Sequence, residues 1–95
     1  MIVKFRILST AQEESTETFL YYESEREGLG EIFLKSLDVV FQNIRVLPLM
    51  YPVIFDDIHR ALVPKFPYAV YYSFENDEAT ILALHNTKRK SPPNF

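Results

Sequence analysis

The chain has 95 residues, no cysteine, a net charge of −3 and 47% hydrophobic residues, among them eight Phe and six Tyr. This length and composition predict a single domain, residues 1–95, with a packed core, and argue against disorder. The lack of cysteine excludes disulfides and thiolate metal sites and fits a reducing cytosol. Lys4 and Arg6 interrupt the apolar N-terminus, which is therefore no signal peptide, and the longest uncharged stretch, residues 46–55, is too short to span a bilayer. We expect a soluble, cytoplasmic protein without a membrane partner.

The charge is unevenly distributed along the chain. Residues 1–47 carry five basic and eight acidic side chains, whereas residues 48–95 carry five of each. Residues 85–95 hold three bases and no acid, so the domain is expected to have a basic C-terminal tail, residues 86–95.

The first elements expected are a strand and a helix. Apolar and charged residues alternate over residues 2–8, as in a half-buried strand. Thr10 and Glu13 have the spacing of a capping box, which predicts a helix start there and a helix that runs to about Arg26. Gly28 follows, and glycine readily adopts the positive φ that ends helices.

A second helix is predicted by one continuous apolar stripe that ends before Pro48. With the first helix and a short glycine-containing turn it makes a helical hairpin. The stripe consists of Phe33, Leu37, Val40, Phe41, Ile44 and Leu47.

Three strands are expected in the second half, at about residues 58–66, 68–75 and 79–85, with a short strand at 53–55. Their short connections predict antiparallel pairing. Pro64 cannot donate to a ladder, so its strand is expected to lie at an edge or to carry a bulge. The order β-α-α-β-β-β predicts an α+β fold, an antiparallel sheet of about four strands covered on one face by the helical hairpin.

Basic side chains gather near one end of this predicted sheet, where they suit a phosphate backbone or another anionic surface. His85 is the sharpest candidate, because imidazole titrates near neutrality and can act as a general acid or base. Tyr71 and Tyr72 are expected to point to opposite faces of their strand, so at most one can face solvent. His59, His85 and the scattered carboxylates lack metal-ligand spacing, so we expect no metal and no cofactor. The candidate binding residues are Arg60, Lys65, His85, Lys88, Arg89 and Lys90.

Several short motifs follow one another along nearly the whole chain. They are Tyr21-Tyr22-Glu23, then Gly28-Leu29-Gly30 with Phe33 and Leu34, then Arg60, Phe66-Pro67-Tyr68 and Tyr71-Tyr72, and last His85, Lys88-Arg89 and Pro92-Pro93-Asn94-Phe95.

In this order the motifs resemble the RelE/ParE superfamily of toxins from type II toxin–antitoxin systems, and the ParE-like, plasmid-stabilisation branch most of all. The resemblance implies a cognate antitoxin as partner and DNA gyrase as target. On this interpretation the protein is not itself an enzyme, and the six basic residues above bind the target.

Two alternatives stay open from the sequence. A RelE-like toxin would be a ribosome-dependent endoribonuclease that cuts mRNA without a metal, with His85, Arg60, Lys65 and Arg89 as catalytic residues and Asp57 as a conceivable acidic partner. The acidic balance also fits an inactive toxin retained as an antitoxin-binding module. The sequence leaves the oligomeric state open.

Overall fold

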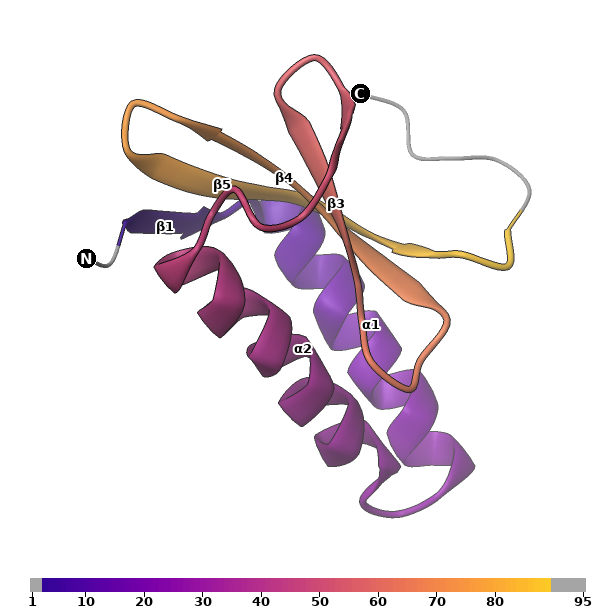
Figure 1. Ribbon diagram of the computed structural model, residues 1–95. Coiled ribbons are helices and arrows are strands. Elements are labelled where there is room, and N and C mark those ends of the chain that lie inside the picture. The colour runs from indigo at the N-terminus through magenta and orange to yellow at the C-terminus, as the bar shows by residue number, and fades with distance from the viewer. Residues whose placement is uncertain (1–2, 90–95) are drawn as a thin grey trace.

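The protein consists of a helical hairpin packed on one face of a five-stranded sheet (Figure 1). The computed structural model describes residues 3–89, so Lys90 and the rest of the tail lie outside the described residues. The elements in chain order are β1 (Lys4–Ile7), α1 (Ser9–Glu25), α2 (Leu29–Val46), β2 (Val53–Phe55), β3 (Ile58–Leu62), β4 (Tyr68–Glu75) and β5 (Glu78–Asn86). The predicted α+β architecture and element order are confirmed, including the short strand at residues 53–55.

The predicted antiparallel sheet of about four strands is confirmed only in part, because the sheet is mixed. The sheet has five strands in the order β1-β5-β4-β3-β2, and β1 pairs with β5 in parallel, Phe5 opposite Ala79. Short loops force antiparallel pairing only between consecutive strands. The whole helical hairpin separates β1 from its partner, and a connection of that length lets the chain return in the same direction.

The predicted capping box at Thr10 and Glu13 is not formed. Helix α1 begins at Ser9, its N-cap is Leu8, and no side chain caps it. The backbone N–H of Leu8 donates to the carbonyl of Ile81 in β5 (3.0 Å), while the Leu8 carbonyl accepts the first helical bond from Gln12 (2.9 Å). The end of the β1–β5 ladder therefore sets the start of the helix.

The turn between the helices depends on Glu23 and two glycines. Gly28 has a φ of 86°, in the left-handed region that favours glycine. The Glu23 carboxylate accepts the N–H groups of Gly28 (3.1 Å) and Gly30 (2.8 Å), which satisfies orphan donors at the start of α2. Gly30 itself sits against Phe19 of α1, where an added Cβ would lie 2.7 Å from the Phe19 carbonyl oxygen. The turn thus fixes the close approach of the two helices.

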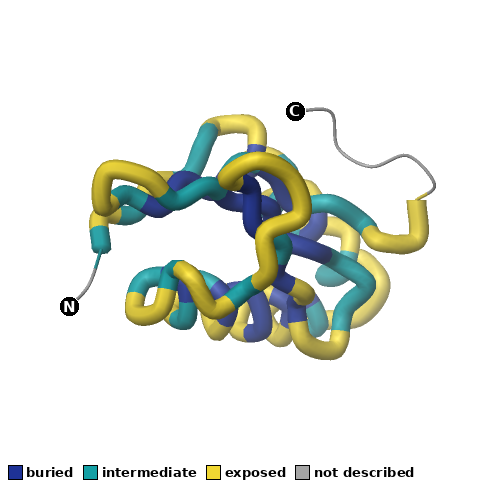
Figure 2. The backbone as a smooth tube through the Cα atoms, turned by 45° about the horizontal axis from the view of Figure 1, so that its top comes forward, coloured by how far each residue is buried: buried dark blue, intermediate teal, exposed yellow. Residues whose placement is uncertain are grey.

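The main core lies between the hairpin and the sheet, and Figure 2 shows buried segments of both layers turned toward each other. Four members of the predicted α2 stripe are buried, namely Phe33, Leu37, Val40 and Ile44. Phe41 is only partly buried, and Leu47, beyond the end of the helix, is exposed. The predicted apolar stripe therefore faces the core along the length of the helix.

Two irregularities shape the long strands. Strand β3 ends at Leu62 and not at residue 66, because Pro64 and Lys65, whose φ is 71°, turn the chain toward β4. In β5 the register shifts between the pairs Tyr71–Ala83 and Tyr72–Ile81, which marks a bulge. The carboxylate of Glu14 on α1 accepts the N–H of Leu84 just after it (3.0 Å), so the first helix holds the irregular part of the strand.

Across residues 3–89, neither helix is long and apolar enough to cross a membrane.

Candidate functional site

The face of the sheet that is turned away from the helices, here called the open face, carries several candidate residues. Its strands are in register, so side chains form rows across it: Arg60 lies opposite Tyr71, and Tyr71 lies opposite Ala83. The next row joins His85, Ala69 and Leu62. Ile58, Ala69, Tyr71 and Ala83 form a second, smaller apolar cluster that contains no helix residue.

Tyr71 lies between the two strongest sequence candidates. The Nε of Arg60 donates to the Tyr71 hydroxyl (3.2 Å), and the Tyr71 ring meets the His85 ring edge-on with centroids 6.3 Å apart. Arg60 and His85 are both half-buried, whereas Tyr71 is buried. The structure therefore brings the predicted arginine and histidine onto one surface, with the Tyr71 hydroxyl accepting a hydrogen bond from the guanidinium.

The other described candidates lie at the end of the sheet. Lys65 is exposed in the β3–β4 turn, and Lys88 and Arg89 are exposed just beyond β5. The N–H of Thr87 donates to the Pro67 carbonyl (2.7 Å), which joins this turn to the start of the tail. Lys65, in the turn after β3, and Lys88 and Arg89, three and four residues beyond His85, thus lie at one end of the sheet. Asp57 is exposed in the β2–β3 turn.

A groove of about 420 Å³ runs between α1 and this basic end. Lys88 and Arg89 line it on one side, and Tyr21, Tyr22 and Glu17 on the other. A hydrogen bond to Glu25 and the negative charge of that carboxylate raise the pKa of Tyr21, and burial raises the pKa of Tyr22. Both phenols therefore remain neutral hydrogen-bond donors well into alkaline pH.

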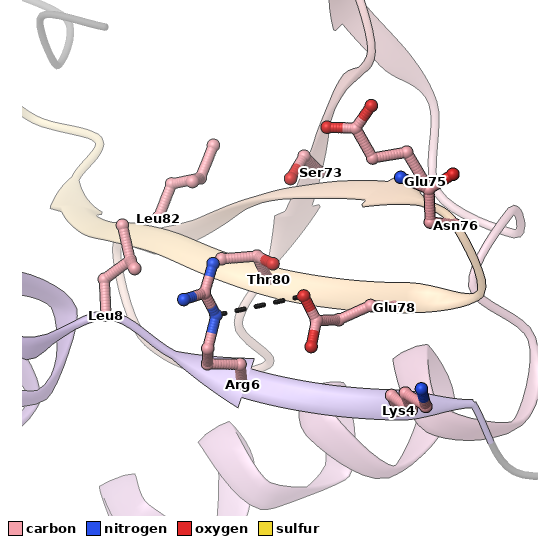
Figure 3. A pocket seen from close by; sticks show the side chains of 9 residues that line it. All are labelled: Lys4, Arg6, Leu8, Ser73, Glu75, Asn76, Glu78, Thr80 and Leu82. Atoms are coloured by element: carbon pink, nitrogen blue, oxygen red, sulfur yellow. Dashed lines mark ion pairs between the residues drawn. The ribbon is translucent and has the colours of Figure 1, made fainter.

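Sequence reasoning missed two further cations on the open face, Lys4 and Arg6 of β1. They line a shallow groove of about 360 Å³ together with residues of β4 and β5 (Figure 3). Arg6 pairs with Thr80 in the ladder, and its Nε lies 3.9 Å from a carboxylate oxygen of Glu78. The alternation of residues 2–8 indicated that these side chains point away from the core, but only the parallel β1–β5 pairing places them here.

Several motif residues that carried the family resemblance are structural. Tyr22, Phe33, Phe66 and Tyr68 form one aromatic cluster with ring centroids 4.9 to 6.3 Å apart, mostly in edge-on contact. Such contacts stabilise aromatic pairs beyond the area that they bury. The cluster ties the tip of the helical hairpin to the β3–β4 turn, so these motifs indicate the fold more directly than the chemistry.

The two histidines lie on opposite faces of the sheet. His59 is buried, stacks on Tyr72 with ring centroids 4.8 Å apart, and its Nδ1 is 2.8 Å from the Tyr51 carbonyl. The expected opposition of Tyr71 and Tyr72 is confirmed, and both are buried. Within residues 3–89 no three His, Asp or Glu side chains form a group that could hold a metal ion.

No protein-family model matches the chain, and no curated protein matches it. The solved structures to which it is similar include a chain from a chromosomal ParDE TA system from P. aeruginosa, with a TM-score of 0.68 and 12% sequence identity. The match covers 92% of this chain and 98% of that chain. At this identity the likeness establishes the fold, and it confirms the fold that the RelE/ParE resemblance implied.

Proposed function

We propose that the protein is the toxin of a type II toxin–antitoxin system, that a cognate antitoxin neutralises it, and that its target is DNA gyrase. The fold likeness to a chain of a ParDE TA system, over nearly the full length of both chains, carries this proposal. The ordered motifs from Tyr21 to Phe95 support the same assignment independently.

The antitoxin is expected to bind where β1 meets the helical hairpin. A groove of about 200 Å³ there is lined mainly by apolar side chains, among them Ile7 of β1 and Leu34 and Phe41 of α2. An amphipathic helix fits such a groove, and an extended segment can pair with the adjoining edge strand. Lys4 and Arg6 on that edge favour an acidic partner.

The target surface in this proposal comprises the cations of the open face and of the sheet end. Arg60 presents a planar guanidinium for bidentate contact with phosphate or carboxylate, and the Tyr71 hydroxyl orients it. Lys65, Lys88 and Arg89 are exposed, so each can approach an anionic surface without prior rearrangement. Lys90, outside the described residues, is proposed to extend the same surface.

The ribonuclease alternative is favoured by one observation, the convergence of Arg60 and His85 on Tyr71. A general acid or base beside a cation is what in-line cleavage of a phosphodiester needs. Lys65 and Arg89, the other two catalytic candidates, are exposed at the end of the sheet. The convergence itself involves two of the four candidates.

Growth inhibition by the chain and its variants separates these functions. For gyrase inhibition, we expect His85→Ala, which removes one of the six proposed binding side chains, to retain most of the toxicity, and truncation before Lys88, which removes three of them, to abolish most of it. For ribonuclease action, His85→Ala is expected to abolish toxicity. Lys35→Ala, which removes an exposed cation from α2, is the matched control and is expected to remain fully toxic in both cases.

Co-purification with the product of the neighbouring gene tests the antitoxin part of the proposal. We expect a stable complex that Phe41→Glu weakens, since that charge would enter the groove at α2. A chain that stays free in the presence of that product contradicts the proposal.

A further inference from the structure

The two edges of the sheet differ in how they are protected. Edge strand β1 carries Lys4 and Arg6, and these like charges discourage pairing with β1 of a second copy. Edge strand β2 has the sequence Val-Ile-Phe, and all three residues are exposed. The ladder geometry leaves polar backbone groups of β2 unpaired on its outer side, because its other side is bonded to β3.

Apolar surface surrounds this unprotected edge. Ile54 and Leu62 line a groove of about 290 Å³ with Tyr51, Pro52 and Arg60, and they are 48% and 59% exposed. The segment leading into β2 adds Leu47, Leu49 and Met50, which are at least half exposed. With Val53 and Phe55, seven exposed apolar side chains therefore lie on or beside this edge.

The charges beside β2 are complementary to those of a second copy. The backbone N–H of Arg60 donates to the Pro52 carbonyl, so Arg60 flanks the beginning of β2. Asp56 and Asp57 occupy the turn at its end. If two β2 strands run antiparallel about a two-fold axis near Ile54, the turn of one copy lies beside the Pro52 of the other. Arg60 is then about two strand spacings, roughly 10 Å between Cα atoms, from the acidic turn. An arginine side chain can span this distance, and in the dimer it exchanges its bond to the Tyr71 hydroxyl for contact with the turn.

We propose that the chain forms a symmetric dimer through antiparallel pairing of β2 with β2 of a second copy. The pairing joins two sheets into one, buries the apolar surface around Ile54 and Leu62, and places Arg60 of each copy against the Asp56–Asp57 turn of the other. The interface is isologous, so each contact occurs twice.

The dimer also has a regulatory consequence, which rests on the function proposed above. Arg60 belongs to the proposed target surface and to this interface, so dimerisation and target binding compete for one side chain. The dimer itself does not depend on that function.

The test uses the full chain, made by cell-free synthesis without any antitoxin, and measures its mass in solution as a function of concentration. We expect a transition from 11.2 kDa to twice that mass at micromolar concentration. Ile54→Lys is expected to weaken the dimer on the order of 100-fold, because each dimer would bury two lysines. The matched control is Val39→Lys, which makes the same kind of change at an exposed apolar residue of α2 and is expected to leave dimerisation unchanged.

Two further measurements address pairing and charge. Amide hydrogens of Val53 to Phe55 should gain protection from exchange as concentration rises, and Arg60→Glu should weaken the dimer at least 10-fold. A chain that stays monomeric at 100-fold higher concentration than expected, or a dimer indifferent to Ile54→Lys, overturns the proposal. Protection of β2 that appears only when an antitoxin is added also overturns it and assigns the edge to that partner.

Discussion

The Glu23 carboxylate is expected to be one of the strongest single contributors to stability outside the core. It accepts two backbone N–H groups, from Gly28 and from the buried Gly30, and it lies at the positive end of the α2 dipole. Hydrogen bonds to a charged group are each worth about 1.5–3 kcal/mol, but water can replace part of the bond to the less buried Gly28. We therefore expect Glu23→Ala to cost about 2–4 kcal/mol. Glu23→Gln, which keeps one acceptor oxygen, should cost about half as much.

Urea unfolding followed by circular dichroism measures this cost. In a domain of this size, 1 kcal/mol corresponds to a shift of about 4–8 °C in Tm, so thermal unfolding gives an independent estimate. Glu27→Ala is the matched control, because Glu27 is an exposed carboxylate of the same turn and should change stability by less than about 0.5 kcal/mol. Equal stabilities for Glu23→Ala and Glu27→Ala would refute the reasoning.

Three other predictions follow from the packing and from one perturbed pKa. Gly30→Ala should cost about 1–3 kcal/mol in urea unfolding, because its Cβ would collide with Phe19; an unchanged midpoint would show that Phe19 moves at no cost. Burial raises the pKa of Tyr72 from its ordinary 10.0 to about 12. The unfolded chain therefore releases this proton at lower pH than the native protein does. Below pH 10 the contribution of neutral Tyr72 to the free energy of unfolding is thus fully present. Between pH 10 and 12 the free energy of unfolding should fall by roughly 2–3 kcal/mol. The same fall in Tyr72→Phe would contradict the assignment of this titration to Tyr72. Glu14→Ala leaves the Leu84 N–H without its acceptor, so about 1–2 kcal/mol should be lost in urea unfolding together with faster amide exchange at Leu84; protection equal to wild type would argue against the bond.

Local patterns in the sequence predicted the elements well. The α2 stripe, the break at Gly28 and the alternation in the strands all reflect local backbone preference combined with burial on one side. Short loops between β3, β4 and β5 also predicted that Arg60 and His85 lie on neighbouring parts of the sheet. Their common face was not predictable in this way, because it depends on the bulge in β5: without that shift of register His85 would pair with Tyr68 and face the core.

What the sequence could not give depends on contacts between distant residues. The parallel pairing of β1 with β5 depends on how the whole hairpin packs, and with it the placement of Lys4 and Arg6 on the open face. Glu14 and Glu23 resembled ordinary solvent-facing carboxylates of a helix. Glu14 bonds to a residue beside the β5 bulge, 70 residues along the chain, and Glu23 bonds to two residues of the turn, five and seven residues along the chain. No periodicity in the local sequence indicates these partners.

The convergence of Arg60 and His85 on Tyr71 has two interpretations, and they differ in what the cell loses first. As a gyrase inhibitor the protein would use these side chains for binding, and DNA synthesis would be affected first. As a ribonuclease it would use them for chemistry, and translation would fail first.

Pulse-labelling of DNA and protein synthesis, in cells induced to express the chain alone, tests the proposed function most directly. We predict that DNA synthesis falls first and that co-expression of the antitoxin restores it. Protein synthesis falling first would contradict gyrase as the target and identify Arg60 and His85 as the active site to test. Undisturbed growth would contradict toxicity itself and leave an antitoxin-binding module.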